Sequence, residues 1–108
     1  MIEYSENFLK EAKKLSKKFK LLKSDLKNAV DEIQTKNDLG ISLGFNLYKK
    51  RIHNSSIPTG KSAGFRLIIY KRVKDKIVLI SIYSKTHQES LTDKELKVLL
   101  NHHLGSKS

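Results

Sequence analysis

The sequence predicts an α+β fold for one domain spanning residues 1–108, with an N-terminal helical hairpin packed on a twisted antiparallel β-sheet and a C-terminal helix. Two changes in hydrophobic period support this prediction. Apolar residues recur every three or four positions up to about residue 40, alternate with period two from Leu43 to Tyr83, and return to helical spacing after Thr92. A chain of 108 residues can bury one modest core, although only 38% of its residues are hydrophobic.

Two helices are expected before the first strand. Residues 5–21 form an amphipathic stretch that Ser5 can cap, with a lysine-rich face that we interpret as solvated. A second helix is expected to begin at Ser24 and Asp25, because an aspartate in the first turn interacts favourably with the helix dipole. Its apolar stripe ends near residues 37–40. The two helices therefore predict an αα-hairpin.

The rest of the chain reads as an antiparallel meander followed by a helix. Strands are expected at Phe45–Ile52, Phe65–Val73 and Ile77–Tyr83, and residues 1–4 can add a short edge strand. Thr92 and Glu95 form a capping box that opens a last helix through Leu100. We expect the helices to cover one face of the sheet and to leave the other face free.

Charge is the strongest property of the composition. Lys and Arg number 22 and Asp and Glu 11, which gives a net charge of +11 and predicts a polyanionic partner: nucleic acid, a ribosome, an anionic membrane or an acidic protein. A lysine-favouring genome is an alternative cause. The chain has no cysteine, which excludes disulfides and thiolate metal sites. It lacks a signal peptide and any apolar run of about 20 residues, so we predict a cytoplasmic protein without a membrane span.

The stretch "SSIPTGKSAGFR", residues 55–66, contains the Gly-Lys-Ser of a phosphate-binding loop. Such a loop needs a glycine where this chain has Ser55, and a helix must follow it. Phe65 to Tyr70 instead reads as a strand, because it is rich in aromatic and β-branched residues. We therefore interpret Gly60-Lys61-Ser62 as part of a connection between strands rather than as a nucleotide site.

Strand alternation predicts a cationic pocket. Lys49 and Arg51 share one side of their strand, Arg66 begins the next strand, and Lys85 lies at the end of the third. If the register brings these four side chains together, like charges crowd one surface. Because like charges repel, such a cluster favours a site for phosphate.

The chain also resembles the RelE/ParE superfamily of type II toxin–antitoxin toxins, and more closely its RelE/HigB-like branch. The matching stretches are "LGFNLYKKRI", "GKSAGFRLIIY", "IVLISIYSK" and "LTDKEL", with a weaker match at "FLKEAKKLSKKF". This resemblance implies a RelE-like fold and ribosome-dependent cleavage of mRNA in the ribosomal A site, with no metal or other cofactor. The implied partners are the mRNA, the ribosome and a cognate antitoxin, expected to be a small helix-turn-helix protein.

The resemblance also implies roles for single residues. Lys49 would act as the base if neighbouring cations favour its neutral form, Arg66 would stabilise the transition state, Arg51 would hold the RNA backbone, and Lys85 would bind phosphate or assist the leaving group. The expected RNA-binding residues are Lys61, Arg72, Tyr83 and His87.

The chain departs from the family at one point. A C-terminal tyrosine of RelE aligns near Leu91, with no aromatic residue after it, so Tyr83 or His87 takes over this role or the role is absent. Two alternatives stay open: a ParE-like toxin that inhibits DNA gyrase, and a non-catalytic basic RNA-binding module. ParE relatives generally lack the four basic residues, which favours the nuclease.

Overall fold

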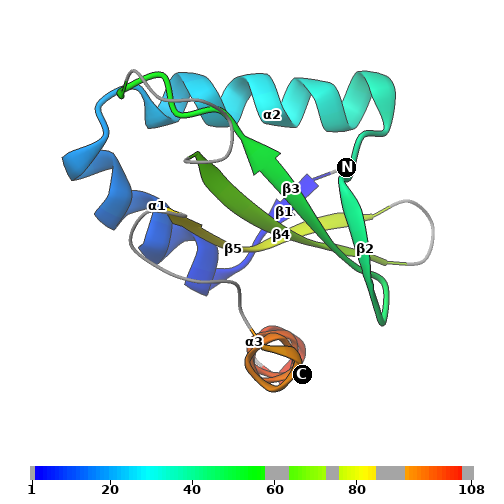
Figure 1. The fold of residues 1–108 in the computed structure, drawn as a ribbon. Helices are drawn as coiled ribbons and strands as arrows, with labels where there is room; N and C mark the ends of the chain where they lie inside the picture. Colours follow the sequence, from blue (N-terminus) through cyan, green and yellow to red (C-terminus); the bar gives the residue numbers. More distant parts are fainter. Residues whose placement is uncertain (1, 58–63, 73–75, 85–91, 106–108) are drawn as a thin grey trace.

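The computed structural model describes residues 2–57, 64–72, 76–84 and 92–105. The elements follow in the order β1 (Ile2–Tyr4), α1 (Glu6–Lys18), α2 (Leu22–Lys36), β2 (Ile41–Gly44), β3 (Leu47–Ile52), β4 (Phe65–Lys71), β5 (Ile77–Ser84) and α3 (Asp93–Gly105). The predicted α+β fold is confirmed, because two helices precede the main sheet strands and one helix follows them (Figure 1).

The five strands form one twisted sheet in the order β1-β5-β4-β3-β2. β2 to β5 pair antiparallel, as expected, whereas β1 runs parallel to β5, so the sheet is mixed. A parallel pair needs a long crossover connection, which the chain between β1 and β5 supplies. β1 is also the short edge strand that the N-terminal residues were expected to add.

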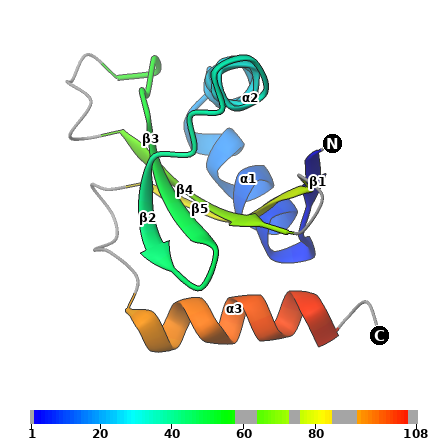
Figure 2. The ribbon, with the colours of Figure 1, turned by 90° about the vertical axis from the view of Figure 1, so that its right-hand side faces the viewer.

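The sheet lies between two helical layers. α1 and α2 cover one face, and α3 lies against the other face (Figure 2). The first layer buries Phe8, Phe19 and Ile33 with β4 and β5, whereas Leu96 of α3 packs in a second cluster with Leu47 of β3. The expectation that one face stays free was therefore wrong in part, because the apolar stripe of α3 must also be buried and takes up part of that face.

The boundary between α1 and α2 differs from the prediction. The cap at Ser5 is confirmed, since its Oγ accepts a hydrogen bond from Phe8 N–H at 3.0 Å. α1 ends at Lys18, before residue 21, and α2 begins at Leu22 rather than at Ser24. The N–H of Leu21 donates to Ser56 Oγ at 3.0 Å, so a residue 35 positions away caps α2. Local sequence contains no signal for such a distant cap.

The first long strand was also predicted wrongly. Residues 41–52 form the β2–β3 hairpin, and β3 begins at Leu47 rather than at Phe45. Phe45 and Asn46 have φ values of 54° and 62°, and Gly44 has 86°. A two-residue hairpin loop with positive φ at both positions matches the twist of the flanking strands. Phenylalanine is an unusual residue at such a position, so the turn was read as part of a strand.

Candidate active site

β3, β4 and β5 bring four predicted site residues onto one face of the sheet. Arg51 lies directly opposite Arg66, and Arg66 lies directly opposite Tyr83. Lys49 comes two residues before Arg51 and therefore points to the same side of β3, where it faces Ile68. We call Lys49, Arg51, Arg66 and Tyr83 the basic row. Four of the eight predicted site residues thus converge on one face of the sheet.

Arg66 has the most unusual environment in the basic row. It is only 5% exposed, and its Nη1 donates a hydrogen bond to the carbonyl oxygen of Phe65 at 3.2 Å. Burial lowers the pKa of Arg66, and the nearby charge of Arg51 lowers it further. An arginine remains protonated in proteins, so two like charges face each other across β3 and β4. Such a cross-strand pair destabilises a sheet and favours an anionic ligand.

Tyr83 completes the basic row on β5. It is 3% exposed, and its hydroxyl has no hydrogen-bond partner among the described residues. A buried tyrosine hydroxyl usually has a partner. In this position it can donate to, or accept from, a ligand that contacts Arg66.

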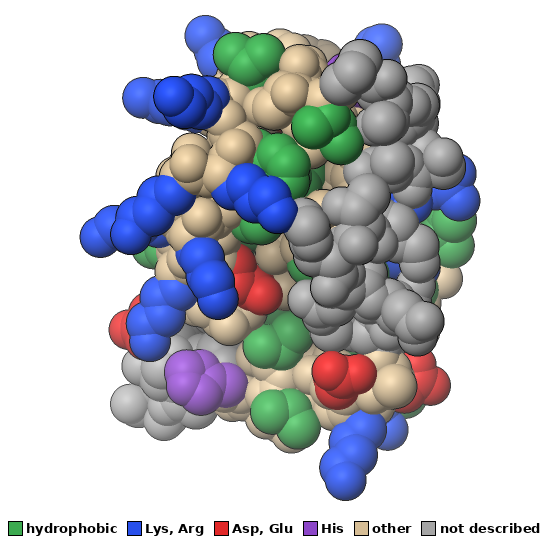
Figure 3. All heavy atoms as spheres, turned by 60° about the vertical axis from the view of Figure 1, so that its left-hand side comes forward, with side chains coloured by type: hydrophobic (Ala, Val, Ile, Leu, Met, Phe, Trp, Pro, Cys, Tyr) green, Lys and Arg blue, Asp and Glu red, His purple; other side chains and the backbone are tan. Residues whose placement is uncertain are grey.

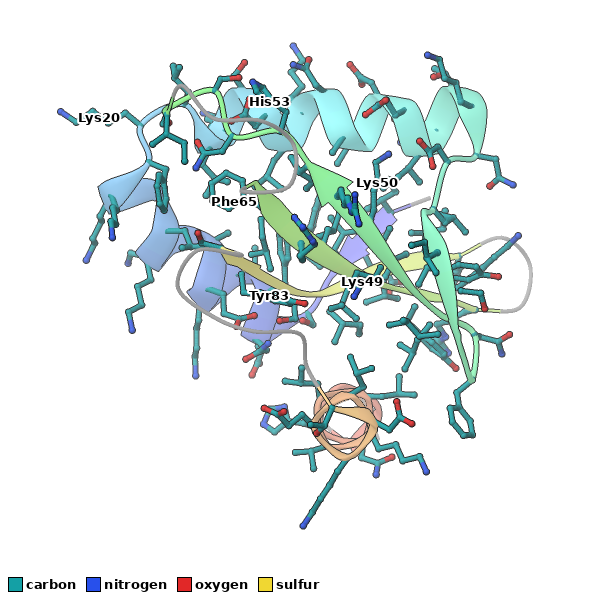
Figure 4. The ribbon with its side chains drawn as sticks, in the orientation of Figure 1. Lys20, Lys49, Lys50, His53, Phe65 and Tyr83 are labelled. Atoms are coloured by element: carbon teal, nitrogen blue, oxygen red, sulfur yellow. The ribbon has the colours of Figure 1, made fainter. Side chains whose placement is uncertain are left out.

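The helix α3 limits the surface around the basic row. Its Leu96 belongs to one apolar cluster with Ile68, Val78, Ile80 and Tyr83 on the same face. Lys49 is half-buried and lies on the side of β3 that faces α3, whereas Lys50 points toward α2 (Figure 4). Within the basic row, Arg51 is thus exposed and Lys49 is half-buried, whereas Arg66 and Tyr83 are buried.

Lys50 shows a different environment for a cation on the same strand. It is 4% exposed, and its Nζ lies 3.0 Å from Asp38 Oδ2 and 3.6 Å from Glu32 Oε1. The hydrogen bond and charge of Lys50 lower the pKa of Asp38. A cleft of about 730 Å³ runs past these residues and also contains Asp25, whose carboxylate accepts hydrogen bonds from Ser55. The lining of this cleft is of mixed charge, because it also includes Lys49 and Arg51.

Glu11 of α1 contacts the strand next to the basic row. Its Oε1 accepts hydrogen bonds from Asn7 Nδ2 at 2.8 Å, Ser81 Oγ at 2.7 Å and Ile82 N–H at 3.2 Å. Burial raises the pKa of Glu11. Ser81 lies opposite Ile68, which in turn lies opposite Lys49. The sequence analysis missed Glu11, because nothing in the sequence links it to a strand 70 residues away.

The other predicted site residues are not brought into this row. Arg72 follows the last residue of β4, six residues from Arg66, which corresponds to about 20 Å along a strand. Its N–H donates to the carbonyl oxygen of Lys76. Lys61, Lys85 and His87 lie outside the described residues, so their predicted roles are not tested.

Further basic side chains gather outside the row. Figure 3 shows Lys and Arg side chains projecting along the side of the molecule on which α1 lies. The exposed lysines of α1 are Lys10, Lys13, Lys14, Lys17 and Lys18. Their exposure agrees with the interpretation of a solvated face. In the part of the chain that the structure describes, no helix is long and apolar enough to cross a membrane.

Comparisons with known proteins place the chain among the small toxins of toxin–antitoxin systems. The family model "RelE toxin of RelE / RelB toxin-antitoxin system" matches residues 7–104. The chain therefore belongs to the RelE toxin family, and the suspected resemblance is confirmed. A solved structure of a mutant of the E. coli toxin RelE in the free state is similar in fold, with a TM-score of 0.55 and 16% identity. The match covers 98% of this chain and 95% of that chain. No curated protein matches the sequence significantly.

Proposed function

We propose that this toxin is a ribosome-dependent endoribonuclease that cleaves mRNA during translation and thereby inhibits protein synthesis. The observation that carries the proposal is the direct pairing of Arg51 with the buried Arg66, one residue from the end of β3 and the start of β4. Two guanidinium groups beside each other offer several N–H donors to one phosphate, and their mutual repulsion falls when an anion lies between them. Membership of the RelE toxin family supports the same activity.

The proposed reaction uses the RNA's own nucleophile. The ribose 2′-oxygen attacks the adjacent phosphorus, the bond from phosphorus to the 5′-oxygen breaks, and a cyclic phosphate and a 5′-OH are formed. Lys49 accepts the proton of the 2′-OH, and Arg66 and Arg51 stabilise the negative charge that builds up on the phosphorane oxygens. Lys85 is the proposed donor of the proton to the departing 5′-oxygen. Positioning and charge stabilisation thus supply the rate enhancement without a metal.

Tyr83 is proposed to contact the RNA next to the scissile phosphate. Its hydroxyl lies opposite Arg66 and lacks a partner within the described part of the chain. A hydroxyl in this place can donate to a phosphate oxygen held by Arg66. This contact would take the place of the aromatic residue that is absent near Leu91. We further propose that a small helix-turn-helix antitoxin neutralises the toxin in the cytoplasm.

A cleavage assay tests the proposal. The purified chain is added to a translated mRNA with ribosomes, and to the same mRNA without them, and cut sites are mapped by primer extension. We expect codon-phased cuts only with ribosomes, and at least a hundredfold slower cutting by Lys49→Ala and Arg66→Ala. Lys27→Ala, an exposed lysine of α2 on the other side of the sheet, serves as the matched control and should cut normally.

Two results would contradict this function. Intact mRNA together with accumulated cleaved DNA would identify a gyrase inhibitor. Normal cutting by both Lys49→Ala and Arg66→Ala, with folding verified by circular dichroism, would show that the basic row does not carry the reaction.

A further inference from the structure

The turn between β2 and β3 carries an aromatic side chain that the fold does not bury. Phe45 is 65% exposed, the largest exposed fraction among the large hydrophobic residues of the described chain. Its φ is 54°, in the left-handed region that disfavours a residue with a Cβ. Glycine or asparagine is the usual residue at this position of a two-residue hairpin turn. Neither burial nor turn geometry therefore accounts for an aromatic residue here.

A lysine lies over one face of the Phe45 ring. The Nζ of Lys97 is 4.8 Å from the ring centroid, a distance typical of a cation–π contact. This contact joins the closed end of the β2–β3 hairpin to α3, which lies beside it in Figure 2. Within the described residues, Lys97 has no carboxylate at ion-pair distance. The surface thus presents an exposed ring together with an uncompensated positive charge.

This combination of side chains suits a nucleotide. A base stacks on an aromatic ring, and a nearby amine attracts the adjacent phosphate. Lys94 lies three residues before Lys97 and therefore on the same side of α3. Lys71 N–H donates to the carbonyl oxygen of Asn46 at 2.9 Å, which places the backbone of a third lysine beside the turn. Residues 39–48 carry no charge, so the hairpin itself does not repel a polyanion.

The turn lies at the opposite end of β3 from the paired arginines. Six residues separate Phe45 from Arg51, which corresponds to about 20 Å along a strand. Lys49 lies between them, on the side of β3 that faces α3 (Figure 4). Leu47 is buried in the cluster with Leu96 of α3, so an RNA strand would run beside α3 rather than beneath it. A phosphate at Arg51 and a base at Phe45 would then be a few nucleotides apart on one extended strand.

We propose that the free face of the Phe45 ring stacks on a base of the mRNA a few nucleotides from the scissile phosphate, with Lys97 beside the phosphate of that nucleotide. This inference rests on the proposed function, because it supposes that the scissile phosphate lies at Arg51 and Arg66. Stacking uses the face of a base rather than its hydrogen-bonding edge, so it holds the strand without selecting a sequence. Phe45 thus contributes to RNA binding and not to the chemical step.

A second copy of the chain fits the hairpin less well. β2 is an edge strand, and its exposed Ile41 offers an apolar contact to another strand. The register of β2 shifts between Ser42 and Gly44, however, and such an irregularity disfavours edge-to-edge pairing. Two copies would also bring together two net charges of +11. RNA matches both the ring and the lysine.

Fluorescence anisotropy with labelled single-stranded RNA tests the proposal on the full chain, without ribosomes. The probe is an oligoribonucleotide of about twelve nucleotides, and its twin has the same phosphates but lacks every base. We expect Phe45→Asn to weaken binding of the probe at least fivefold and to leave binding of the twin within about twofold, because only a base can stack on the ring. Phe45→Trp should bind the probe at least as tightly as the parent chain.

Two control variants accompany Phe45→Asn. Val98→Asn removes a similarly exposed apolar side chain from α3 and should leave binding of both probes within about twofold. Lys97→Gln should weaken binding of the probe and of its twin by about two- to threefold, since both carry the phosphates. Lys27→Gln makes the same change of charge on α2, on the other side of the sheet, and should have a smaller effect than Lys97→Gln.

Thermal unfolding separates RNA binding from a structural role of the ring. Phe45→Asn should raise the melting temperature by about 4 °C, because asparagine tolerates the left-handed conformation better than phenylalanine. A lower melting temperature together with equal loss of binding to both probes would assign the ring a structural role and overturn the proposal. Unchanged binding of the probe by Phe45→Asn would overturn it as well.

Self-association is the remaining alternative. A dimer in analytical ultracentrifugation that Phe45→Asn abolishes, without a change in RNA binding, would assign the hairpin to a second copy and overturn the proposal. The cleavage assay is independent of these measurements. Base-dependent binding at Phe45 without mRNA cleavage by the parent chain would refute only the nuclease. Cleavage of mRNA by the parent chain without base-dependent binding at Phe45 would refute only the stacking.

Discussion

The buried cations on the two faces of the sheet have different neighbours. On the face toward α2, the buried Lys50 forms ion pairs with Asp38 and Glu32. On the face toward α3, Arg51 and the buried Arg66 lie opposite each other, and the charge of Arg51 lowers the pKa of Arg66. The first arrangement compensates a charge that folding has removed from water. The second places two guanidinium groups on directly opposite positions of neighbouring strands, an arrangement that is unfavourable for strand pairing and that an anionic ligand can relieve.

The same contrast holds for apolar packing. The α1 and α2 layer buries a large cluster that includes Phe65, Leu67 and Ile69 of β4, none of which is measurably exposed. The cluster on the other face, toward α3, is smaller and includes Tyr83 of the basic row. We infer that packing of the helical hairpin on the sheet supplies most of the stability of the domain. The face toward α3 has less apolar packing and carries the candidate active site.

The largest expected effect is on the rate of mRNA cleavage and comes from a substitution of Arg66. Arg66→Leu should slow mRNA cleavage by about 10²- to 10³-fold, because the side chain proposed to stabilise the phosphorane is lost. Its free energy of unfolding should change by less than about 1 kcal/mol, since the variant also removes a buried charge beside Arg51. Primer extension and urea denaturation measure the two effects. Arg66→Lys keeps the positive charge but lacks the planar guanidinium group. Its cleavage rate should lie between those of the parent chain and Arg66→Leu. Strong destabilisation by Arg66→Leu would assign Arg66 a structural role.

The next effect concerns Gly40, which precedes β2 and lies against the backbone of β3. Gly40 has a φ of +84°, and a Cβ added to it would lie 2.8 Å from the Cα of Lys50. Gly40→Ala should therefore lower the free energy of unfolding by about 2–4 kcal/mol. Alanine is strained at this φ, and its Cβ would clash with the backbone of β3. Gly44 is a matched control, since its φ is +86° but nothing lies within 4 Å of an added Cβ. Gly44→Ala should cost only about 1–2 kcal/mol in thermal unfolding. Equal losses would mean that the close approach to β3 is unimportant.

The sequence predicted those parts of the fold that local pattern determines. The capping box of α3 is confirmed, with hydrogen bonds of 3.0 Å from Thr92 N–H to Glu95 Oε1 and of 3.2 Å from Glu95 N–H to Thr92 Oγ1. β4 and β5 were found because their apolar runs are long and rich in β-branched residues. The start of α2 was missed because its cap, Ser56, is distant in sequence. The β2–β3 turn was missed because its left-handed conformation has Phe45 where glycine or asparagine is common.

The candidate site was predictable to the extent that it depends on alternation. Period two decides that Lys49 and Arg51 share a side, but only the register decides that Arg51 meets Arg66. The burial of Arg66 depends on tertiary packing and could not be read from the sequence. Glu11 illustrates the same limit, because its three donors come from α1 and from β5.

Glu11 links α1 to β5, and its substitution should lower stability in a pH-dependent way. Glu11→Ala should cost about 2–3 kcal/mol, because the Ser81 hydroxyl and the Ile82 N–H lose their acceptor. Glu11→Gln keeps the Oε1 acceptor and removes the charge. Since burial raises the pKa of Glu11 above 4.5, its contribution to stability is complete below the unfolded pKa and is lost as the pH rises through the folded pKa. Urea denaturation should therefore show Glu11→Gln gaining stability relative to the parent chain between pH 4 and pH 7. A constant difference would show that Glu11 is not desolvated.

The smallest expected effect comes from the compensated charge, and its pH dependence has the opposite sign. The hydrogen bond and charge of Lys50 lower the pKa of Asp38 below 3.8, so the stability from this pair is present above the unfolded pKa and is lost as the pH falls through the folded pKa. Asp38→Asn should cost only about 1 kcal/mol at neutral pH, because Asp38 is half exposed and Glu32 remains near Lys50. In a Lys50→Met background, Asp38→Asn should have almost no effect, since its partner is gone. An equal cost of Asp38→Asn in both backgrounds would mean that Asp38 does not stabilise Lys50, and the contrast between the two faces of β3 would then rest on the arginine pair alone.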